Sequence, residues 1–150
     1  MEYNFHPALS SLPAAFLTAV VVCELLLLRR DSATLRSVAK GNLWFAAVGY
    51  LLAFFSGYQG LDYAHQSFTV PEELIDMHHT IGRAGLFVVW PLLALRVVAE
   101  RARENARALW IIYGLVLVLV YGVTLYASFL GGGLVFQHGA GVAATFQTAN

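Results

Sequence analysis

The stretch that decides the fold is ALWIIYGLVLVLVYGVTLYASFL, residues 108–130, in which no side chain is charged. About 20 mainly apolar residues are enough for one helix to cross the ~30 Å hydrocarbon core of a bilayer. Three further apolar stretches lie at residues 8–28, 43–58 and 82–98, although Gly57, Gln59 and Gly60 make the end of the second less distinct. Only 12% of the residues are charged and 59% are hydrophobic, whereas a soluble domain is about 25% charged. The chain has too little polar surface for a soluble domain, so the sequence predicts an integral membrane protein.

Basic and acidic residues lie in different connecting loops. Eight of the nine Lys and Arg residues lie in the first and third loops: Arg29, Arg30, Arg36, Lys40, Arg96, Arg101, Arg103 and Arg107. The second loop holds no basic residue, and its charged residues are Asp62, Glu72, Glu73 and Asp76. Because cytoplasmic loops carry the excess of Lys and Arg, the pattern predicts a multi-pass membrane protein with both termini and the acidic second loop outside and the two basic loops in the cytoplasm. The net charge of zero gives no indication of a nucleic-acid partner.

Short loops between successive spans make neighbouring helices antiparallel. The sequence therefore predicts an all-α, up-down four-helix bundle in one domain over residues 1–150, with helices at 8–29, 42–60, 71–98 and 108–130. Thr69 and Glu72 have the spacing of a capping box at the third helix, and Pro91 favours a kink in its middle. Residues 131–150 are expected to fold back along the interface, rather than to follow a simple glycine cap at 131–133.

Three features of the first helix carry their own expectations. The N-terminus lacks a basic segment and a small-residue cleavage site, so this helix is expected to be retained rather than removed as a signal peptide. Glu24 lies about one turn from Arg29, so we expect it to snorkel toward or pair with that arginine, with a proton relay as the alternative. Cys23 is the only cysteine, which excludes an internal disulfide and covalent attachment of a c-type haem.

The five histidines of this apolar chain all lie at ends of apolar runs: His6, His65, His78, His79 and His138. The predicted topology places all of them at the outer side. Ionisable groups at membrane depth are costly and mark functional sites, and neutral imidazole is a common ligand of haem iron and transition metals. His78 and His79 point about 100° apart on a helix, so at most one is expected to ligate a given centre. Arg83, the only basic residue predicted on the outer half, needs an anion: a haem propionate, a quinone or lipid oxygen, or a carboxylate such as Asp62.

Four sequence elements together resemble one known family. They are His6-Pro7 followed by Pro13, the segment from Gly57 to Asp62, the His78-His79 pair, and the Gly-Gly-x-Leu-Val-x-x-His-Gly-x-Gly-Val pattern of residues 131–142. Over nearly the whole chain the sequence resembles the DUF2231 family of small four-helix bacterial membrane proteins. Members of that kind occur joined to Rieske or c-type cytochrome modules, which implies redox work in the membrane with a b-type haem. The resemblance implies His6, His79 (or His78) and His138 as motif histidines, with the redox partner on a separate chain.

The leading hypothesis is a membrane b-type cytochrome subunit that binds one or two haems b near the outer side. Axial ligands are expected from His78 or His79 with His138, and from His6 with His65 at a second site, with Arg83 beside a propionate. The expected partners are the lipid bilayer, a redox subunit, a periplasmic cytochrome or Rieske protein, and a quinone.

Two alternatives to the cytochrome stay open. One is a non-haem transition-metal site in which Asp62 or Glu73 joins the histidines His6, His65, His79 and His138. The other is a structural anchor subunit of a membrane redox complex. The sequence shows no nucleophile–base pair, phosphate loop or acid pair, so we expect an electron-transfer subunit of an oxidoreductase complex rather than an enzyme acting alone.

Overall fold

The computed structural model describes residues 5–67, 70–102 and 106–140, and for residues 62–67 it describes the backbone alone. The described residues form five helices: α1 (His6–Leu9), α2 (Leu12–Leu27), α3 (Ala33–Ser67), α4 (Glu72–Arg101) and α5 (Ala106–His138). Helices α1 and α2 together make one span, so four helical spans in this part of the chain are long and apolar enough to cross a bilayer. The predicted all-α four-helix membrane bundle is confirmed.

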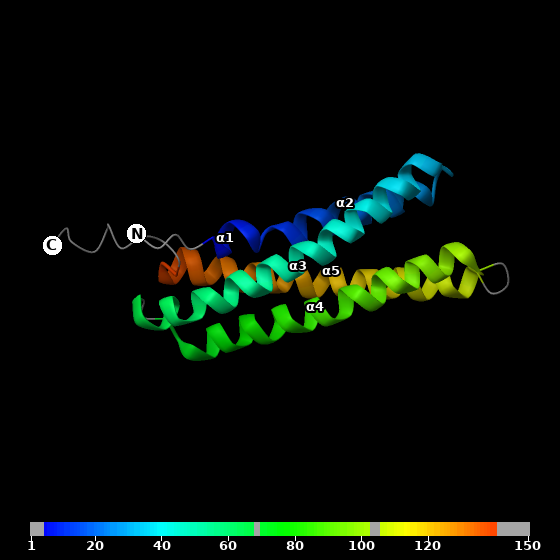
Figure 1. The fold of residues 1–150 in the computed structure, drawn as a ribbon. Coiled ribbons are helices and arrows are strands. Elements are labelled where there is room, and N and C mark those ends of the chain that lie inside the picture. Colours follow the sequence, from blue (N-terminus) through cyan, green and yellow to red (C-terminus); the bar gives the residue numbers. More distant parts are fainter. Residues whose placement is uncertain (1–4, 68–69, 103–105, 141–150) are drawn as a thin grey trace.

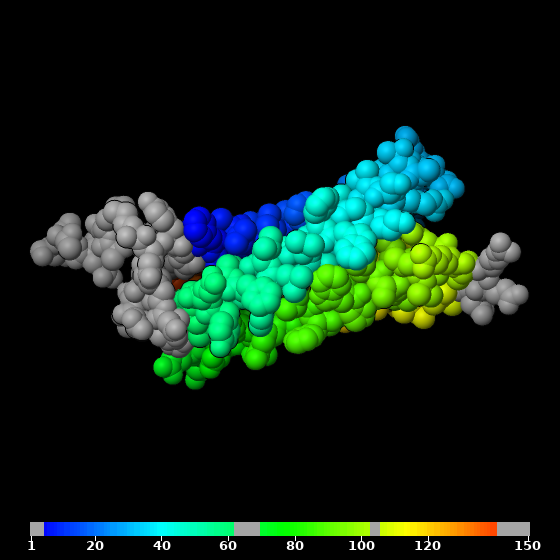
Figure 2. Space-filling model, viewed as in Figure 1, coloured from blue at the N-terminus to red at the C-terminus, as the bar shows by residue number. Residues whose placement is uncertain are grey.

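The spans run up and down along one long axis (Figure 1). They pack as two hairpins, α2 with α3 and α4 with α5, which meet mainly through α3 and α4. One end of the bundle, which we call the histidine end, is formed by α1, the end of α3, the start of α4 and the end of α5. The end of α2, the start of α3, the end of α4 and the start of α5 lie at the opposite end, where the two hairpins diverge (Figures 1 and 2).

Helix α3 begins well before the predicted residue 42. Its 35 residues, at about 1.5 Å each, span roughly 50 Å, more than the ~30 Å hydrocarbon core. Ser32 accounts for the early start, because its hydroxyl accepts a hydrogen bond from the N–H of Leu35 at 3.3 Å. This bond satisfies one of the donors that a helix start leaves open. Most of the predicted first loop is therefore the first turns of α3.

Pro13 explains why the first span is not the continuous helix predicted over residues 8–29. Proline has no N–H, so the bond that would close onto the Leu9 carbonyl is missing. Two hydroxyls provide donors near the break: Ser10 donates to the Pro7 carbonyl at 3.2 Å, and Ser11 to the Ala8 carbonyl at 2.9 Å. Such local side-chain bonds compete with helix continuation. The break leaves α1 as a separate short helix that carries His6.

The start of α4 and the end of α5 also differ from the prediction. Pro71 precedes α4 and no side chain caps it, while Thr69 of the predicted capping box lies outside the described residues. Helix α5 does not stop before Gly131 but continues to His138, and Gly139 ends it in the left-handed region at φ 68°, where glycine is favoured. Glycines 131–133 stay helical because a bilayer offers their backbone no other hydrogen-bond partners. The predicted interfacial segment is thus helical as far as His138, and its residues 141–150 lie outside the described part.

The half of the core away from the histidines contains a group of charged and polar side chains, which we call the arginine cluster: Glu24, Lys40, Arg96, Glu100 and Tyr113. Arg96 is fully buried and donates hydrogen bonds to Tyr113 Oη at 2.9 Å and to Glu100 at 3.2 Å. It also forms an ion pair with Glu24, and Lys40 binds Glu100 at 2.8 Å. Two cations and two carboxylates balance, which offsets the cost of taking each charge out of water. The cluster joins all four spans.

The arginine cluster corrects two expectations. Glu24 pairs with Arg96 rather than with Arg29, and Arg96 belongs to α4 rather than to the third loop. The spacing of the residues in α4 indicates that Arg96 is buried. Arg96 continues the buried stripe of Val89, Leu92 and Leu93, and these positions share one helix face. Arg96 therefore points inward for the same reason as its apolar neighbours.

Gly85 of α4 lies directly against Tyr50 of α3. A Cβ atom on Gly85 would lie 2.7 Å from Cζ of Tyr50, and the Tyr50 hydroxyl is already hydrogen-bonded to Thr124. Gly85→Ala is therefore expected to lower the free energy of unfolding by about 1–3 kcal/mol, the usual cost of overpacking. Gly82→Ala is the matched control, because nothing lies within 4 Å of its added Cβ and alanine favours the helix. Thermal unfolding in detergent measures both, and equal stability would contradict the Tyr50–Gly85 contact.

Candidate functional site

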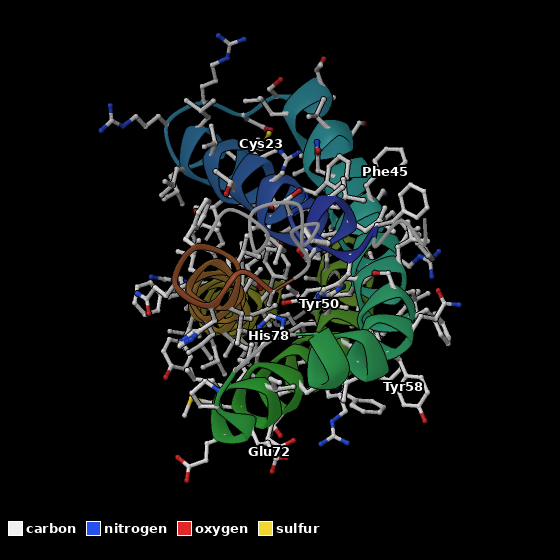
Figure 3. The ribbon with its side chains drawn as sticks, turned by 90° about the vertical axis from the view of Figure 1, so that its left-hand side faces the viewer. Cys23, Phe45, Tyr50, Tyr58, Glu72 and His78 are labelled. Carbon is white, nitrogen blue, oxygen red and sulfur yellow. The ribbon has the colours of Figure 1, made fainter. Side chains whose placement is uncertain are left out.

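A cavity of about 480 Å³ lies at the histidine end between the two hairpins. We call it the histidine cavity, and residues from α1 to α5 line it, among them His6, Tyr50, His78, His79, Arg83 and Gly131. Ligand sites are typically clefts of about 300–1,000 Å³ with mainly apolar walls and a few polar groups. Figure 3, a view from the histidine end, shows His78 and Tyr50 pointing toward the centre of the bundle, with Tyr58 and Glu72 at the periphery.

His6 is held by helix α3. Its Nδ1 lies 3.0 Å from Oγ of Ser56, whose hydroxyl donates in turn to the Ala53 carbonyl at 3.1 Å. With that hydroxyl proton donated to Ala53, Ser56 accepts from Nδ1 of the neutral His6 ring. The Ala53 carbonyl is itself a second acceptor for the His6 ring. A Cβ on Gly57 would lie 2.9 Å from Cε1 of the ring. Glycine at this position therefore lets the His6 ring lie directly against α3.

His78 is held by helix α5 in a similar way. Its Nδ1 lies 3.1 Å from the Ala127 carbonyl oxygen, and a carbonyl can only accept, so Nδ1 again carries the proton and Nε2 the lone pair. One turn further along α5, a Cβ on Gly131 would lie 3.0 Å from Cε1 of the ring. Each imidazole thus rests on the longer neighbouring helix of its own hairpin.

The two imidazole rings approach each other across the histidine cavity. Their centroids are 6.1 Å apart and their planes are inclined at 74°. Metal–imidazole bonds are about 2 Å long, so two rings at this separation are close enough to hold one metal ion between them. Histidine ligands also usually donate their other ring N–H to a fixed acceptor, as the Nδ1 atoms of His6 and His78 do here. The separation and the outer hydrogen bonds therefore both suit a pair of ligands to one centre.

Two imidazoles suit a haem better than a bare metal ion. Protein metal sites generally use three or four side-chain ligands, and within the described ranges no group of three His, Cys, Asp or Glu side chains could hold a metal. Haem iron needs only one or two protein ligands, because the porphyrin supplies the others. The donor set and the cavity therefore fit haem, and the non-haem alternative gains no support from the side chains described. Those of His65 and Asp62 are not among them.

Of the other predicted site residues, some line the histidine cavity and one does not. His79 and Arg83 also line the histidine cavity, and Arg83 is exposed. His138 is the last residue of α5 and is not among the residues that line the cavity. The structure therefore brings His6 together with His78, a pair that the sequence did not combine.

The sequence analysis missed the groups that orient the two rings. Ser56 lies within an apolar run, where a single hydroxyl is a weak signal. Ala127 acts through its backbone carbonyl, which no side-chain pattern reveals. Gly131 was expected to begin the interfacial segment, although in the structure it is a helical residue of α5 that makes room for the His78 ring.

The floor of the histidine cavity is closed by a hydrogen-bonded pair. The Thr124 hydroxyl donates to the Val120 carbonyl at 2.7 Å, so it accepts from the Tyr50 hydroxyl. Both residues line the cavity, and Tyr50 belongs to the apolar core that continues below it with Leu17, Leu117 and Val120. This core separates the histidine cavity from the arginine cluster.

Four apolar spans around a cavity faced by two imidazoles define a multi-pass helical membrane protein with a candidate two-histidine ligand site. The chain belongs to the DUF2231 family, whose family model, described as a predicted membrane protein, matches residues 2–144. Neither a curated protein nor a solved structure matches the chain. The family expected from the sequence motifs is confirmed.

Proposed function

We propose that this protein is a b-type cytochrome subunit that binds one haem in the histidine cavity, where His6 and His78 are the side chains that would hold the iron. The observation that carries the proposal is the pair of imidazoles from different hairpins, 6.1 Å apart, each with Nδ1 bound to an acceptor. Bound haem would supply reversible one-electron transfer. The protein's own part is to present two Nε2 lone pairs, to surround the macrocycle with apolar side chains and to limit the access of water.

Arg83 is the residue in this proposal that neutralises a haem propionate. It lines the histidine cavity and its side chain is exposed, so an anionic group at the cavity mouth can reach both the guanidinium and water. Guanidinium–carboxylate hydrogen bonds are charge-assisted and among the stronger ones in proteins. His79 also lines the cavity, one turn before Arg83 in α4, and is a second polar side chain beside the proposed propionate.

The proposed orientation places the histidine end outside the cytoplasm. Arg29, Arg30 and Arg101 lie at the opposite end, at or just beyond the ends of α2 and α4, and the positive-inside rule favours the cytoplasm for that end. A haem at the histidine end would then exchange electrons with a periplasmic cytochrome or Rieske protein, or with a quinol in the outer half of the bacterial inner membrane. This role is that of an electron-transfer subunit.

The absorption spectrum of the full chain, purified in detergent from haem-replete cells, tests the proposal. The expected result is a Soret band, a haem b pyridine haemochrome and about one haem per chain. A colourless protein with no haemochrome would refute the proposal and favour the structural-anchor alternative. Two haems per chain would point to a second site that includes His65 or His138.

A further inference from the structure

We propose that Ser56 is a positioning residue for haem iron: its hydroxyl orients His6 and sets how strongly that imidazole binds the metal. This inference rests on the proposed haem function. It assigns a role to a residue of α3 that touches neither iron nor macrocycle and that acts only through the His6 ring.

The hydrogen bonds at Ser56 have a fixed direction. The hydroxyl proton points to the Ala53 carbonyl at 3.1 Å, which is one turn back in the same helix. The hydroxyl lone pairs are therefore left to accept from His6 Nδ1 at 3.0 Å. Ser56 is followed directly by Gly57, which leaves the space that the His6 ring fills. Two consecutive residues thus supply the acceptor and the room for one imidazole.

His6 depends on such a support more than His78 does. It lies in α1, a helix of 4 residues that is separated from α2 by the break at Ser10 and Ser11. His78 lies inside the 30-residue helix α4, and its acceptor is a backbone carbonyl of α5. A short helix cannot by itself fix the rotation of a side chain at its first residue. The hydrogen bond to Ser56 therefore adds a restraint from α3 on the His6 ring, beside the Ala53 carbonyl of the same helix.

Ser56 also affects the chemistry of the ligand. Donation of the Nδ1 proton to an acceptor makes Nε2 a stronger electron donor to a bound metal. A stronger donor stabilises ferric iron more than ferrous iron, so it lowers the midpoint potential of the one-electron couple. Loss of the Ser56 hydroxyl is thus expected to raise the midpoint potential and to weaken haem binding. Removal of such an outer hydrogen-bond partner typically costs about 10–100-fold in metal affinity.

The test compares three variants of the full chain with haem bound in detergent. Ser56→Ala is expected to bind haem about tenfold or more weakly, to have a more positive midpoint potential, and to bind carbon monoxide when reduced because His6 is released more easily. Ser56→Thr keeps a hydroxyl and should restore the wild-type values. Ser37→Ala is the matched control, since Ser37 is an exposed serine of the same helix α3 and is not among the residues that line the cavity; it should behave like the wild type.

A haem-free measurement separates this inference from the proposed function. In protein labelled with ¹⁵N-histidine and prepared without haem, Ser56→Ala is expected to shift the His6 ring-nitrogen signals, which are assigned by their loss in His6→Ala. Ser37→Ala should leave them in place. Absence of haem from the wild type would refute the cytochrome proposal alone, whereas unchanged His6 signals in Ser56→Ala would overturn the role of Ser56. Wild-type haem affinity and potential in Ser56→Ala would overturn it too, and would mean that the Ala53 carbonyl is a sufficient acceptor.

Discussion

Replacing His78 by alanine is expected to abolish haem retention during purification. The variant removes one of the two Nε2 donors and also the ring that fills the space between the Ala127 carbonyl and Gly131. Loss of an outer partner already costs about 10–100-fold in metal affinity, so loss of a direct ligand is expected to cost at least as much. Haem per chain, measured as the pyridine haemochrome, should fall to near zero. His6→Ala is expected to retain some haem through His78 and to bind carbon monoxide when reduced.

His138→Ala is the decisive control for this prediction. The sequence pattern pairs His138 with His78 or His79, whereas the structure leaves His138 outside the residues that line the cavity. The variant is therefore expected to keep its full haem content. Added imidazole should restore the spectrum of His78→Ala by entering the vacated space, which shows that this variant is folded. The ligand assignment is wrong if His138→Ala loses haem while His78→Ala retains it.

Replacing Arg96 by methionine is expected to cause the largest loss of stability in the chain. Arg96 is fully buried and bonds to Tyr113, to Glu100 and to Glu24. Removal of one partner of a buried ion pair typically costs about 3–5 kcal/mol, because the other charge is left without compensation. The free energy of unfolding in detergent measures the effect. Haem content should change little under folding conditions, because an apolar core lies between this cluster and the histidine cavity.

A double-mutant cycle distinguishes lost pairing from lost packing at Arg96. Adding Glu24→Gln to Arg96→Met removes the stranded carboxylate charge, so the double variant should be more stable than the sum of the two single changes implies. Arg36→Met is the exposed control, since Arg36 pairs with Asp31 while its side chain is 45% exposed. Surface pairs contribute about 0–1 kcal/mol. Strict additivity in the cycle, or an equal loss in Arg36→Met, would contradict the central role of Arg96.

The sequence predicted most of the fold because bilayer thickness imposes a length and an apolar composition on every span. It was less accurate where local hydrogen bonding sets helix ends. Ser32 starts α3 early, Pro13 breaks the first span, and Gly139 rather than Gly131 ends α5. Such boundaries depend on a few side chains and on the lack of competing water in a bilayer.

The candidate site could be predicted in part. The position of a residue along its helix follows from the sequence, so all five histidines and Arg83 could be assigned to one end of the bundle before any packing was known. Rotation about the helix axis and the choice of neighbouring helices follow only from packing. For this reason the sequence paired Glu24 with Arg29, whereas the structure pairs it with Arg96. Likewise, nothing in the sequence indicated that the His6 ring lies beside that of His78.

The sequence by itself determined that this is an all-α membrane protein with four spans, that it belongs to its family, and that its histidines gather toward one end. Only the tertiary structure decided which imidazoles face each other, which groups orient them, and that a buried arginine joins the spans in the other half of the core. The physical reason is the distance along the chain over which each interaction acts. Apolar length and local hydrogen bonds act along the chain, whereas a ligand pair or a buried ion pair forms between helices that only packing brings together.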